Sequence, residues 1–380
     1  MHVAVVIGTR PEAIKMAPLI HRLRRERIPT SVISSGQHRE MLRQVMDIFH
    51  VVVDHDLEVM RPNQTLNGLT TAIIEALDAK LAKLGPDWVL VHGDTTTAMA
   101  ATLAAFHRGI SVGHVEAGLR TGDLARPFPE ELNRRCVDVV ASLLWAPTTG
   151  ARENLERETL SRNKTILVTG NTAIDALIWA SKKIESTASL KHDLSLRFPF
   201  LGNRSRTLLV TGHRRESFGE GFENICAALR ELSRRPDLEI IYPVHLNPNV
   251  IGPVNRILGG VENIHLIEPQ DYLSFVHLMS RADVILTDSG GVQEEGPSLG
   301  KPVLVMRDVT ERPEAMAAGT VRLVGADRVK IVHGVSRLLD DAEEMNRMAR
   351  AINPYGDGQA SGRIVKSLVH PEAAFEAWTG

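Results

Sequence analysis

The sequence predicts an α/β protein made of two doubly wound domains, each with a parallel sheet between layers of helices. Three observations lead to this fold class. Short β-branched runs alternate with longer helical patterns, the runs are continuously apolar, and the same rhythm restarts near residue 207. Continuous apolar runs are typical of parallel strands covered on both faces, and the strand–helix–strand spacing indicates right-handed βαβ units.

The first domain begins with a buried strand at residues 3–7. The helix behind it begins near Pro11, and its apolar residues recur at helical spacing. Helical patterns also cover residues 66–84 and 150–160. Further strands are predicted at residues 30–34, 88–92, 111–115 and 165–169.

The second domain repeats this order after the polar stretch 181–203, and we place a hinge at residues 170–175. Ligands of doubly wound sheets bind beyond the carboxyl ends of the strands, so the expected site is a crevice between the domains. The strands of this domain are predicted at residues 207–211, 239–244, 264–267, 284–287 and 302–305.

Composition disfavours several classes of protein. The chain has 380 residues with 44 Lys+Arg and 46 Asp+Glu, a formal net charge of -2, and no basic stripe, which disfavours a nucleic-acid partner. No apolar run approaches the roughly 18 residues that a membrane span needs. The run at residues 3–7 is too short for a signal peptide. The two cysteines, Cys136 and Cys226, have neither metal-site spacing nor disulfide density, so a reducing cytoplasm fits.

Carboxylates follow the predicted strands of the first half. Asp94 and Glu116 each follow a strand, and Glu130 opens a helix behind Pro129. Taken singly, Asp94 could be a helix N-cap and Glu130 an ordinary first-turn acid. Together they favour proton transfer, which requires closely placed carboxylates with separated pKa values. At the first strand, Arg10 and Lys15 fit either an anion site at a helix N-terminus or an ordinary turn.

The second half carries cationic and small residues at equivalent positions. His213 lies beside two arginines after the first strand, which suits a phosphate leaving group. Ser289, Gly290 and Gly291 join a strand to a helix, and such small residues let backbone N–H groups approach a phosphate. Glu295 could accept hydrogen bonds from a ribose.

With these residues gathered, the chain closely resembles the non-hydrolysing UDP-N-acetylglucosamine 2-epimerases along its whole length. The motifs occur in the family's order: GTRPE (8–12), QHRE (37–40), HGDTTT (92–97), HVEAGLRTGD (114–123), PEELNR (129–134), GNTAID (170–175), TGHRRESFG (211–219), TDSGGVQEE (287–295), TERPE (310–314) and NPYGDGQAS (353–361).

The resemblance implies a GT-B-type fold of two Rossmann-like domains with the active site in the cleft between them. We expect domains at residues 1–170, carrying the acid/base carboxylates, and 171–360, binding UDP, with residues 361–380 crossing back to the first. The implied reaction interconverts UDP-N-acetylglucosamine and UDP-N-acetylmannosamine by elimination and re-addition of UDP through 2-acetamidoglucal, supplying N-acetylmannosamine units for cell-surface polysaccharide. No cofactor, metal, membrane or nucleic acid is implied, and a cytoplasmic homodimer is.

The resemblance also assigns residues to roles. Asp94, Glu116, Glu130 and His213 are the expected catalytic groups. Nine further residues would bind the substrate: Arg10, Lys15, Gln270, Phe275, Ser289, Gly290, Gly291, Glu295 and Arg312. A second, activating UDP-N-acetylglucosamine would meet Gln37, His38, Arg61, Gln64, Arg215 and His245.

Three other functions fit parts of the pattern. A GT-B glycosyltransferase shares the nucleotide cradle but does not need three acidic groups for proton transfer. A hydrolysing epimerase would release UDP and free N-acetylmannosamine. A sugar-nucleotide sensor would tolerate loss of Asp94, Glu116 and Glu130, and all three are present.

Overall fold

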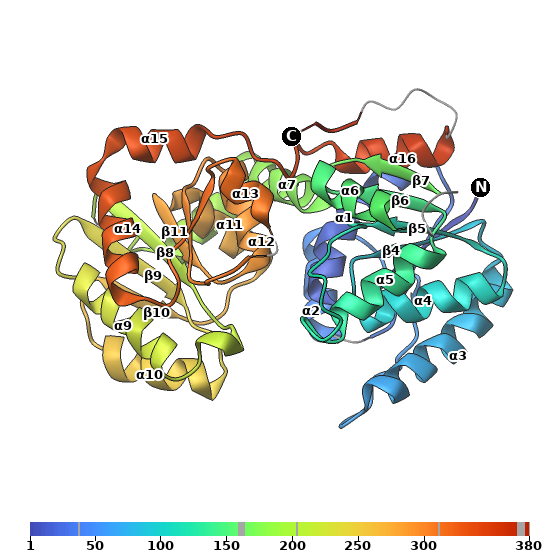
Figure 1. Ribbon diagram of the computed structural model, residues 1–380, viewed down its shortest axis with the longest axis horizontal. Helices are drawn as coiled ribbons and strands as arrows, with labels where there is room; N and C mark the ends of the chain where they lie inside the picture. Colours follow the sequence, from blue (N-terminus) through green and yellow to red (C-terminus); the bar gives the residue numbers. More distant parts are fainter. Residues whose placement is uncertain (37–38, 159–163, 203, 311, 371–376, 380) are drawn as a thin grey trace. The chain divides into compact units, whose positions relative to one another are not determined.

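The computed structural model describes residues 1–36, 39–158, 164–202, 204–310, 312–370 and 377–379 (Figure 1). The chain forms two compact units. Unit 1 comprises Met1–Ala176 and Tyr355–Gly380, and unit 2 comprises Leu177–Pro354.

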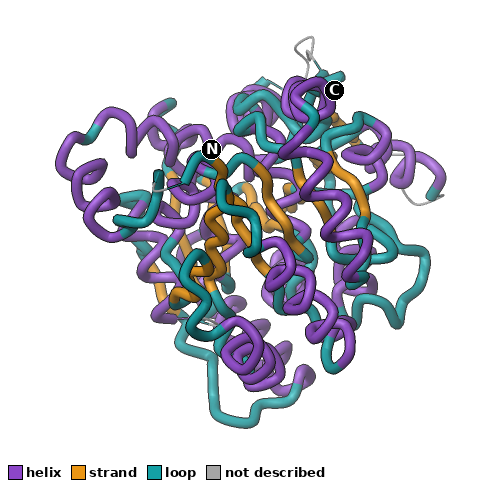
Figure 2. The backbone as a smooth tube through the Cα atoms, turned by 90° about the vertical axis from the view of Figure 1, so that its left-hand side faces the viewer, coloured by secondary structure: helices purple, strands orange, loops and turns teal. Residues whose placement is uncertain are grey.

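Within its described residues, unit 1 is built on a seven-stranded sheet of order β3-β2-β1-β4-β5-β6-β7, in which every neighbouring pair is parallel. Helices cover both of its faces (Figures 1 and 2). The strands are β1 (Val3–Ile7), β2 (Thr30–Ser34), β3 (His55–Asp56), β4 (Trp88–His92), β5 (Ser111–Val115), β6 (Leu143–Ala146) and β7 (Thr165–Val168). The helices are α1 (Arg10–Arg25), α2 (Arg39–Ile48), α3 (Leu66–Leu84), α4 (Thr96–His107), α5 (Glu130–Val140), α6 (Thr149–Arg157) and α16 (Ala360–Val369).

The buried residues of unit 1 show why helices pack against its sheet. All five residues of β1 are buried, as a central parallel strand requires. Helix α4 begins with Thr95 as its N-cap and presents a run of small residues, of which Ala98, Ala101, Ala104 and Ala105 are buried against the sheet. The sheet thereby brings the carboxyl ends of β1, β4 and β5 to one edge.

Unit 2 repeats the arrangement with a six-stranded parallel sheet of order β10-β9-β8-β11-β12-β13 among its described residues. The strands are β8 (Arg206–Thr211), β9 (Leu238–Pro243), β10 (Ile264–Ile267), β11 (Val284–Thr287), β12 (Val303–Val305) and β13 (Val321–Leu323). Around them are α8 (Ala188–Arg197), a 3₁₀ turn η2 (Arg215–Ser217), α9 (Glu220–Leu232), α10 (Pro248–Leu258), α11 (Tyr272–Arg281), α12 (Gly290–Ser298), α13 (Pro313–Ala317), α14 (Arg328–Asp340) and α15 (Ala342–Arg350). Buried side chains of α9, α10 and α14 pack with this sheet into a second core.

The chain passes from unit 1 to unit 2 inside helix α7 (Thr172–Ser186) and returns at Tyr355. The predicted boundaries at 170/171 and 360/361 differ from these because both flanks are tied to unit 1. The N–H of Asn171 donates to the Tyr355 carbonyl at 2.7 Å, and Asp175 accepts the N–H groups of Ala360 and Ser361 at 3.1 and 2.8 Å. The segment 170–175 is therefore a helix start fixed to unit 1.

The two parallel sheets with alternating helices confirm the α/β class and the predicted strands, whose ends shift by a residue or two. The sequence prediction missed β3, β6 and β13. The polar stretch 181–203 that precedes the second run of strands contains the end of α7 at Ser186 and the whole of α8.

Gly118 gives a first prediction. It has φ 87, and an added Cβ would overlap the carbonyl oxygen of Ala151, whereas Gly122 has φ 82 and open space around it. We expect Gly118→Ala to lower the free energy of unfolding by about 3 kcal/mol and Gly122→Ala by about 1 kcal/mol, the cost of the backbone conformation alone. Urea unfolding of both variants measures the difference, and equal losses would contradict the close packing at Gly118.

Candidate active site

Glu116 occupies a constrained turn directly after β5. Its φ of 67 is left-handed, a conformation that costs a non-glycine residue about 1–2 kcal/mol. Its side chain is 9% exposed, and Oε2 accepts hydrogen bonds from Lys15 Nζ at 2.5 Å and from Asn171 Nδ2 at 2.8 Å. His92 Nε2 lies 3.5 Å from the same oxygen. The residue with the strained backbone is thus also one whose carboxylate is held in one position by hydrogen bonds.

These neighbours keep Glu116 ionised. Burial by itself raises the pKa of a carboxyl group, but the neighbouring Lys15 and His92 outweigh burial and hold the pKa of Glu116 well below its ordinary value. Glu116 therefore enters any reaction near neutral pH as a carboxylate. Lys15, which the family resemblance assigns to the substrate, donates a hydrogen bond to Glu116.

This lowered pKa gives a second prediction, for Glu116→Gln. A group whose pKa is lower in the folded than in the unfolded protein stabilises the fold above its unfolded pKa, and that stability is lost as pH falls through the folded pKa. We expect the variant to be less stable than wild type at pH 7 and the difference to shrink below about pH 4. Urea unfolding at several pH values measures it, and a difference that grows on acidification would contradict the assignment.

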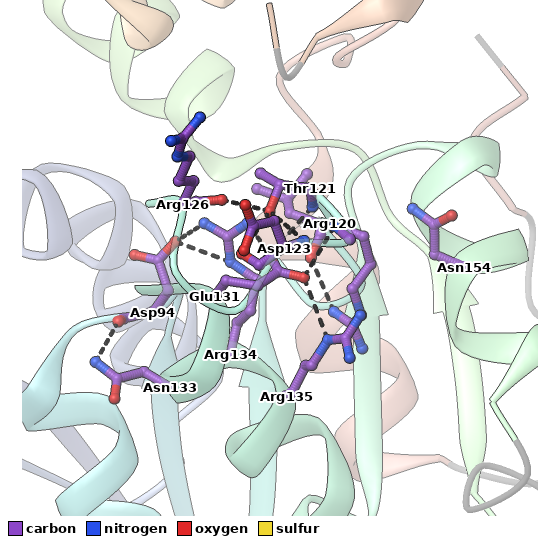
Figure 3. Close-up of polar contacts among 12 residues, drawn as sticks. Asp94, Arg120, Thr121, Asp123, Arg126, Glu131, Asn133, Arg134, Arg135 and Asn154 are labelled. Atoms are coloured by element: carbon purple, nitrogen blue, oxygen red, sulfur yellow. Dashed lines mark hydrogen bonds and ion pairs between the residues drawn. The ribbon is translucent and has the colours of Figure 1, made fainter. Parts of the chain in front are cut away.

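Asp94 lies in the turn after β4 and faces α5. Its Oδ2 accepts Nη2 of Arg134 at 2.5 Å and Nε at 3.2 Å, and its carbonyl accepts Asn133 Nδ2 at 3.0 Å (Figure 3). The side chain remains 28% exposed. The N-cap of α4 is Thr95, so the alternative reading of Asp94 as that cap is wrong.

Glu130 and Glu131 differ sharply although they are adjacent. Glu131 is fully buried and accepts the N–H groups of Thr121 and Gly122 and both Arg134 and Arg135 (Figure 3). Oε2 of Glu130 is buried and has no hydrogen-bond partner among the described residues. An unpaired buried oxygen is costly, so Glu130 is the member of the pair available to a ligand.

The fold brings the three predicted carboxylates to neighbouring elements of unit 1. A Cβ placed on Gly93, the residue before Asp94, would lie 3.9 Å from Oε1 of Glu116. Arg134, which holds Asp94, lies one helical turn after Glu130 in α5 and on the same face. The three groups have different surroundings. Glu116 accepts hydrogen bonds from a lysine and an amide, Asp94 pairs with an arginine, and one oxygen of Glu130 has no partner among the described residues.

At the start of α1, the side chain of Glu12 occupies two of the backbone N–H groups that an anion could use. Glu12 turns back and accepts the N–H of Gly8 at 3.0 Å and of Thr9 at 2.7 Å, in a capping box. Its second oxygen accepts the hydroxyl of Thr95 at 2.6 Å, which ties α1 to the start of α4. Any anion at this end of β1 would therefore meet Arg10, the first residue of α1, and not the backbone of Gly8 or Thr9.

In unit 2, buried Asp288 shapes the turn that carries His213. Its Oδ2 accepts the backbone N–H groups of His213 and Arg214 at 2.7 and 2.8 Å, and its Oδ1 lies 3.4 Å from Nδ1 of His213. The His213 ring also stacks on His245 at 5.5 Å. Burial, with the Arg214 charge and His245, lowers the pKa of His213 against the opposing effect of Asp288. The imidazole is therefore neutral near pH 7 and can donate one hydrogen bond.

The turn from β11 to α12 has the form of a phosphate cradle. Ser289 is the N-cap of α12, and a Cβ on Gly290 would lie 2.6 Å from Nη1 of Arg312. Arg312 is held there by Glu294, whose Oε1 accepts its Nε at 2.6 Å. Glycine at 290 is thus required for the guanidinium to lie over the helix N-terminus, and the Gly291 position faces open space.

The remaining predicted substrate ligands lie nearby in unit 2. Glu295 is buried one turn into α12, and its Oε1 accepts the Tyr272 hydroxyl at 3.1 Å. Gln270 precedes α11 and donates to the Glu268 carbonyl at 2.6 Å, and Phe275 lies on α11.

The residues predicted for a second ligand fall into separate groups. Arg61 and Gln64 share a loop before α3, where the N–H of Arg61 donates to Oε1 of Gln64 at 3.3 Å. Arg215 begins the turn η2 in unit 2, and His245 stacks on His213. Gln37 and His38 lie outside the described residues.

Sequence reasoning missed the groups that orient the predicted ones. Arg134, Asn171 and Asp288 hold Asp94, Glu116 and the His213 turn, respectively. Each lies inside a motif already quoted, and Arg134 stands four residues after Glu130, so helical spacing was the available signal.

Among the described residues, no helix is long and apolar enough to cross a membrane, and no three His, Cys, Asp or Glu side chains are grouped as metal ligands.

Comparison with known proteins identifies the family. The model of the UDP-N-acetylglucosamine 2-epimerase family matches residues 21–369. A UDP-N-acetylglucosamine 2-epimerase of Salmonella typhimurium is 57% identical over 370 residues, covering 97% of this chain and 98% of the relative. The UDP-GlcNAc 2-epimerase of Neisseria meningitidis, solved bound to UDP-GlcNAc, has 50% identity and a TM-score of 0.90, covering 97% of this chain and 100% of that one. That of Methanocaldococcus jannaschii, in complex with UDP-GlcNAc and UDP, has 34% identity and a TM-score of 0.81 over 97% of this chain and 100% of its own.

These matches confirm the predicted GT-B class of fold and extend over nearly the whole sequence. The chain belongs to the UDP-N-acetylglucosamine 2-epimerase family, whose members are isomerases.

Proposed function

We propose that the chain interconverts UDP-N-acetylglucosamine and UDP-N-acetylmannosamine without hydrolysis, by eliminating UDP across carbons 1 and 2 and adding it back. The observation that carries this proposal is the set of three carboxylates on neighbouring elements of unit 1, each in a different electrostatic environment. Such differences let one group act as a base while another delivers a proton. Membership of the family and the UDP-GlcNAc bound by relatives support the choice of substrate.

The reaction imposes a clear division of tasks. The hydrogen on carbon 2 is weakly acidic, so its removal must accompany departure of a good leaving group. A carboxylate takes the proton, the C–H electron pair forms the double bond between carbons 1 and 2, and the bond from carbon 1 to the diphosphate oxygen breaks. The products are 2-acetamidoglucal and UDP. Re-addition of UDP with protonation of carbon 2 from the other face gives the epimer, and no external oxidant or reductant is consumed.

Asp94, Glu116 and Glu130 are the proposed proton-handling groups of unit 1. Glu116 is ionised in the resting protein, and Glu130 has an oxygen without a protein partner. Asp94 is exposed enough to reach a ligand while Arg134 fixes its direction. The charged partners of Asp94 and Glu116 are in place before substrate arrives, which reduces the reorganisation that the reaction requires.

The unit 2 residues are proposed to hold UDP. The N-terminus of α12 at Ser289, Gly290 and Gly291, with the Arg312 guanidinium over it, suits the diphosphate, and Arg10 of unit 1 is proposed to add a further positive charge. Neutral His213 would donate a hydrogen bond to the leaving diphosphate.

The nucleoside is assigned to Glu295, one turn into α12, and to two residues at and before the first turn of α11. Glu295 would accept the ribose hydroxyls, since the Tyr272 hydroxyl already fixes its direction. Gln270 and Phe275 would contact uracil.

Three wider proposals accompany the activity. Arg61, Gln64, Arg215 and His245 are assigned to an activating second UDP-N-acetylglucosamine, and the stacking of His245 on His213 gives such a ligand a route to the catalytic imidazole. The chain is proposed to act as a homodimer in the cytoplasm. Its product would supply N-acetylmannosamine units for cell-surface polysaccharide.

Product analysis tests the activity. Purified protein is incubated with UDP-N-acetylglucosamine, without acceptor or added cofactor, and the products are followed by NMR. We expect a mixture of the two UDP-sugars that reaches the same ratio from either side. Release of UDP with free N-acetylmannosamine would favour a hydrolysing enzyme. UDP release that requires an added acceptor would favour a transferase, and binding without turnover would favour a sensor.

A further inference from the structure

His114 lies directly behind the two turns that carry Asp94 and Glu116. It belongs to β5, its side chain is completely buried, and both ring nitrogens are hydrogen-bonded. Nε2 lies 2.8 Å from the carbonyl oxygen of Gly93, and Nδ1 lies 2.6 Å from Oδ1 of Asp138. Gly93 immediately precedes Asp94 in the chain.

The hydrogen bonds of His114 define its charge. A backbone carbonyl can only accept, so Nε2 must donate to Gly93. Asp138 is also an acceptor, because its other carboxylate oxygen already accepts from the Arg120 guanidinium and from the backbone N–H of Gly118. Both ring nitrogens therefore carry protons, and the side chain is an imidazolium.

Asp138 connects this imidazolium to the second turn. Its Oδ2 accepts the backbone N–H of Gly118 at 3.3 Å, two residues after Glu116, and lies 2.8 Å from Nη1 of Arg120. Arg120 makes a bidentate pair with Glu158 at 2.8 and 2.9 Å. The buried His114–Asp138 pair thus contacts the backbone of both turns, at Gly93 and at Gly118. Neither side chain is among the groups proposed to exchange a proton with substrate.

We propose that His114, as an imidazolium between Asp138 and the Gly93 carbonyl, is a positioning residue that fixes the Asp94 and Glu116 turns relative to each other. A carboxylate that exchanges a proton with carbon 2 must be placed to within a fraction of an ångström, and a misplacement of about 1 Å costs about 10²-fold in rate. His114 and Asp138 supply that placement through backbone contacts. Their effect on epimerisation rests on the proposed function, whereas their effect on the turns does not.

Two substitutions separate the two hydrogen bonds of the ring. The amide nitrogen of asparagine can replace Nδ1 and that of glutamine can replace Nε2. His114→Asn therefore keeps the bond to Asp138 and loses the one to Gly93, and His114→Gln does the reverse. We expect the Gly93 amide, which donates to the Val115 carbonyl at 2.9 Å, to exchange with deuterium at least about tenfold faster in His114→Asn. In His114→Gln the faster amide should be that of Gly118.

The kinetic readout distinguishes positioning from general stability. Both variants should lower kcat for epimerisation by about 10- to 100-fold with KM within about threefold of wild type, because the UDP-holding residues are untouched. His265→Gln is the matched control. His265 pairs with buried Glu239 in unit 2, far along the chain from both carboxylate turns, and should alter neither kcat nor exchange at Gly93 and Gly118.

The outcomes are distinct. In wild type, ¹⁵N NMR should show both ring nitrogens of His114 protonated at pH 7, and a ring with one unprotonated nitrogen would overturn the imidazolium. Exchange that is unchanged, or that is the same in both His114 variants, would overturn the positioning role even if the protein epimerised no sugar. A kcat loss of equal size in His265→Gln would overturn it as well. Failure of wild type to epimerise would remove the proposed function and leave the exchange result to decide the role of His114.

Discussion

Glu130→Gln is expected to lower kcat by about 10²- to 10⁴-fold, the contribution of one general acid or base, while changing the free energy of unfolding by less than about 1 kcal/mol. The reason is the buried Oε2, which has no partner within the described structure. Glutamine keeps the shape and loses the ability to exchange a proton, and no arginine or backbone group depends on that oxygen. Steady-state epimerisation and urea unfolding of the variant measure the two quantities.

Glu131→Gln is the matched control from the same helical turn. Glu131 is fully buried and neutralises Arg134, which is itself 8% exposed. Removing one partner of a buried ion pair typically costs 3–5 kcal/mol, so we expect the free energy of unfolding to fall by about 3 kcal/mol, with a secondary loss of kcat through Arg134 and Asp94. If Glu130→Gln were the destabilised variant and Glu131→Gln the stable one, the assignment of the two acids would be reversed.

Asp94→Asn is the second substitution with a large expected effect. We expect kcat to fall by about 10²- to 10⁴-fold and the affinity for UDP to stay within about tenfold of wild type. Asparagine retains an oxygen toward Arg134 but cannot take up a proton, and Arg134 still has Glu131 at 3.0 Å. Epimerisation rates and UDP titration calorimetry provide the two numbers. A collapse of UDP binding would show that Asp94 holds the fold of the site and does not handle protons.

Asp78→Asn controls for the loss of an aspartate–arginine pair as such. Asp78 pairs with Arg108 at 2.5 Å, the same separation as Asp94 and Arg134, but joins α3 to the end of α4 away from the carboxylate turns. Its side chain is 48% exposed, so solvent strongly screens the attraction within this pair. Turnover of Asp78→Asn should equal that of wild type.

The strands that could be predicted are those whose own residues favour the extended conformation. β1, β2, β4 and β5 are five-residue strands rich in β-branched residues, and all four were predicted with their final bounds. β3, with two residues, and β13, with three, are held by pairing to a neighbouring strand, which the local sequence does not reveal. β6 reads Leu-Leu-Trp-Ala, which carries no β-branched residue.

The candidate site was predictable as a set of residue types and not as a set of contacts. Spacing and motif placed Asp94, Glu116 and Glu130 at strand ends or a helix start, as the structure has them. Partners distant in sequence were not predictable: Lys15 reaches Glu116 from α1, and Asn171 reaches it from beyond β7. The capping of α1 by Glu12 was not predictable either, because it depends on a side-chain conformation in which Glu12 also accepts the hydroxyl of Thr95. The left-handed φ of Glu116 has no signal in the residue type at all.

Hydrogen exchange at carbon 2 distinguishes proton transfer through the carboxylates from a route that keeps the original hydrogen. Wild-type protein is incubated with UDP-N-acetylglucosamine in deuterated water, and carbon 2 of both UDP-sugars is followed by NMR. A carboxyl group that has taken a proton exchanges it with solvent. We therefore expect N-acetylmannosamine units to form with deuterium at carbon 2 and deuterium also to enter the recovered N-acetylglucosamine units. Epimerisation in which the original hydrogen stays on carbon 2 would contradict proton transfer by Asp94, Glu116 and Glu130.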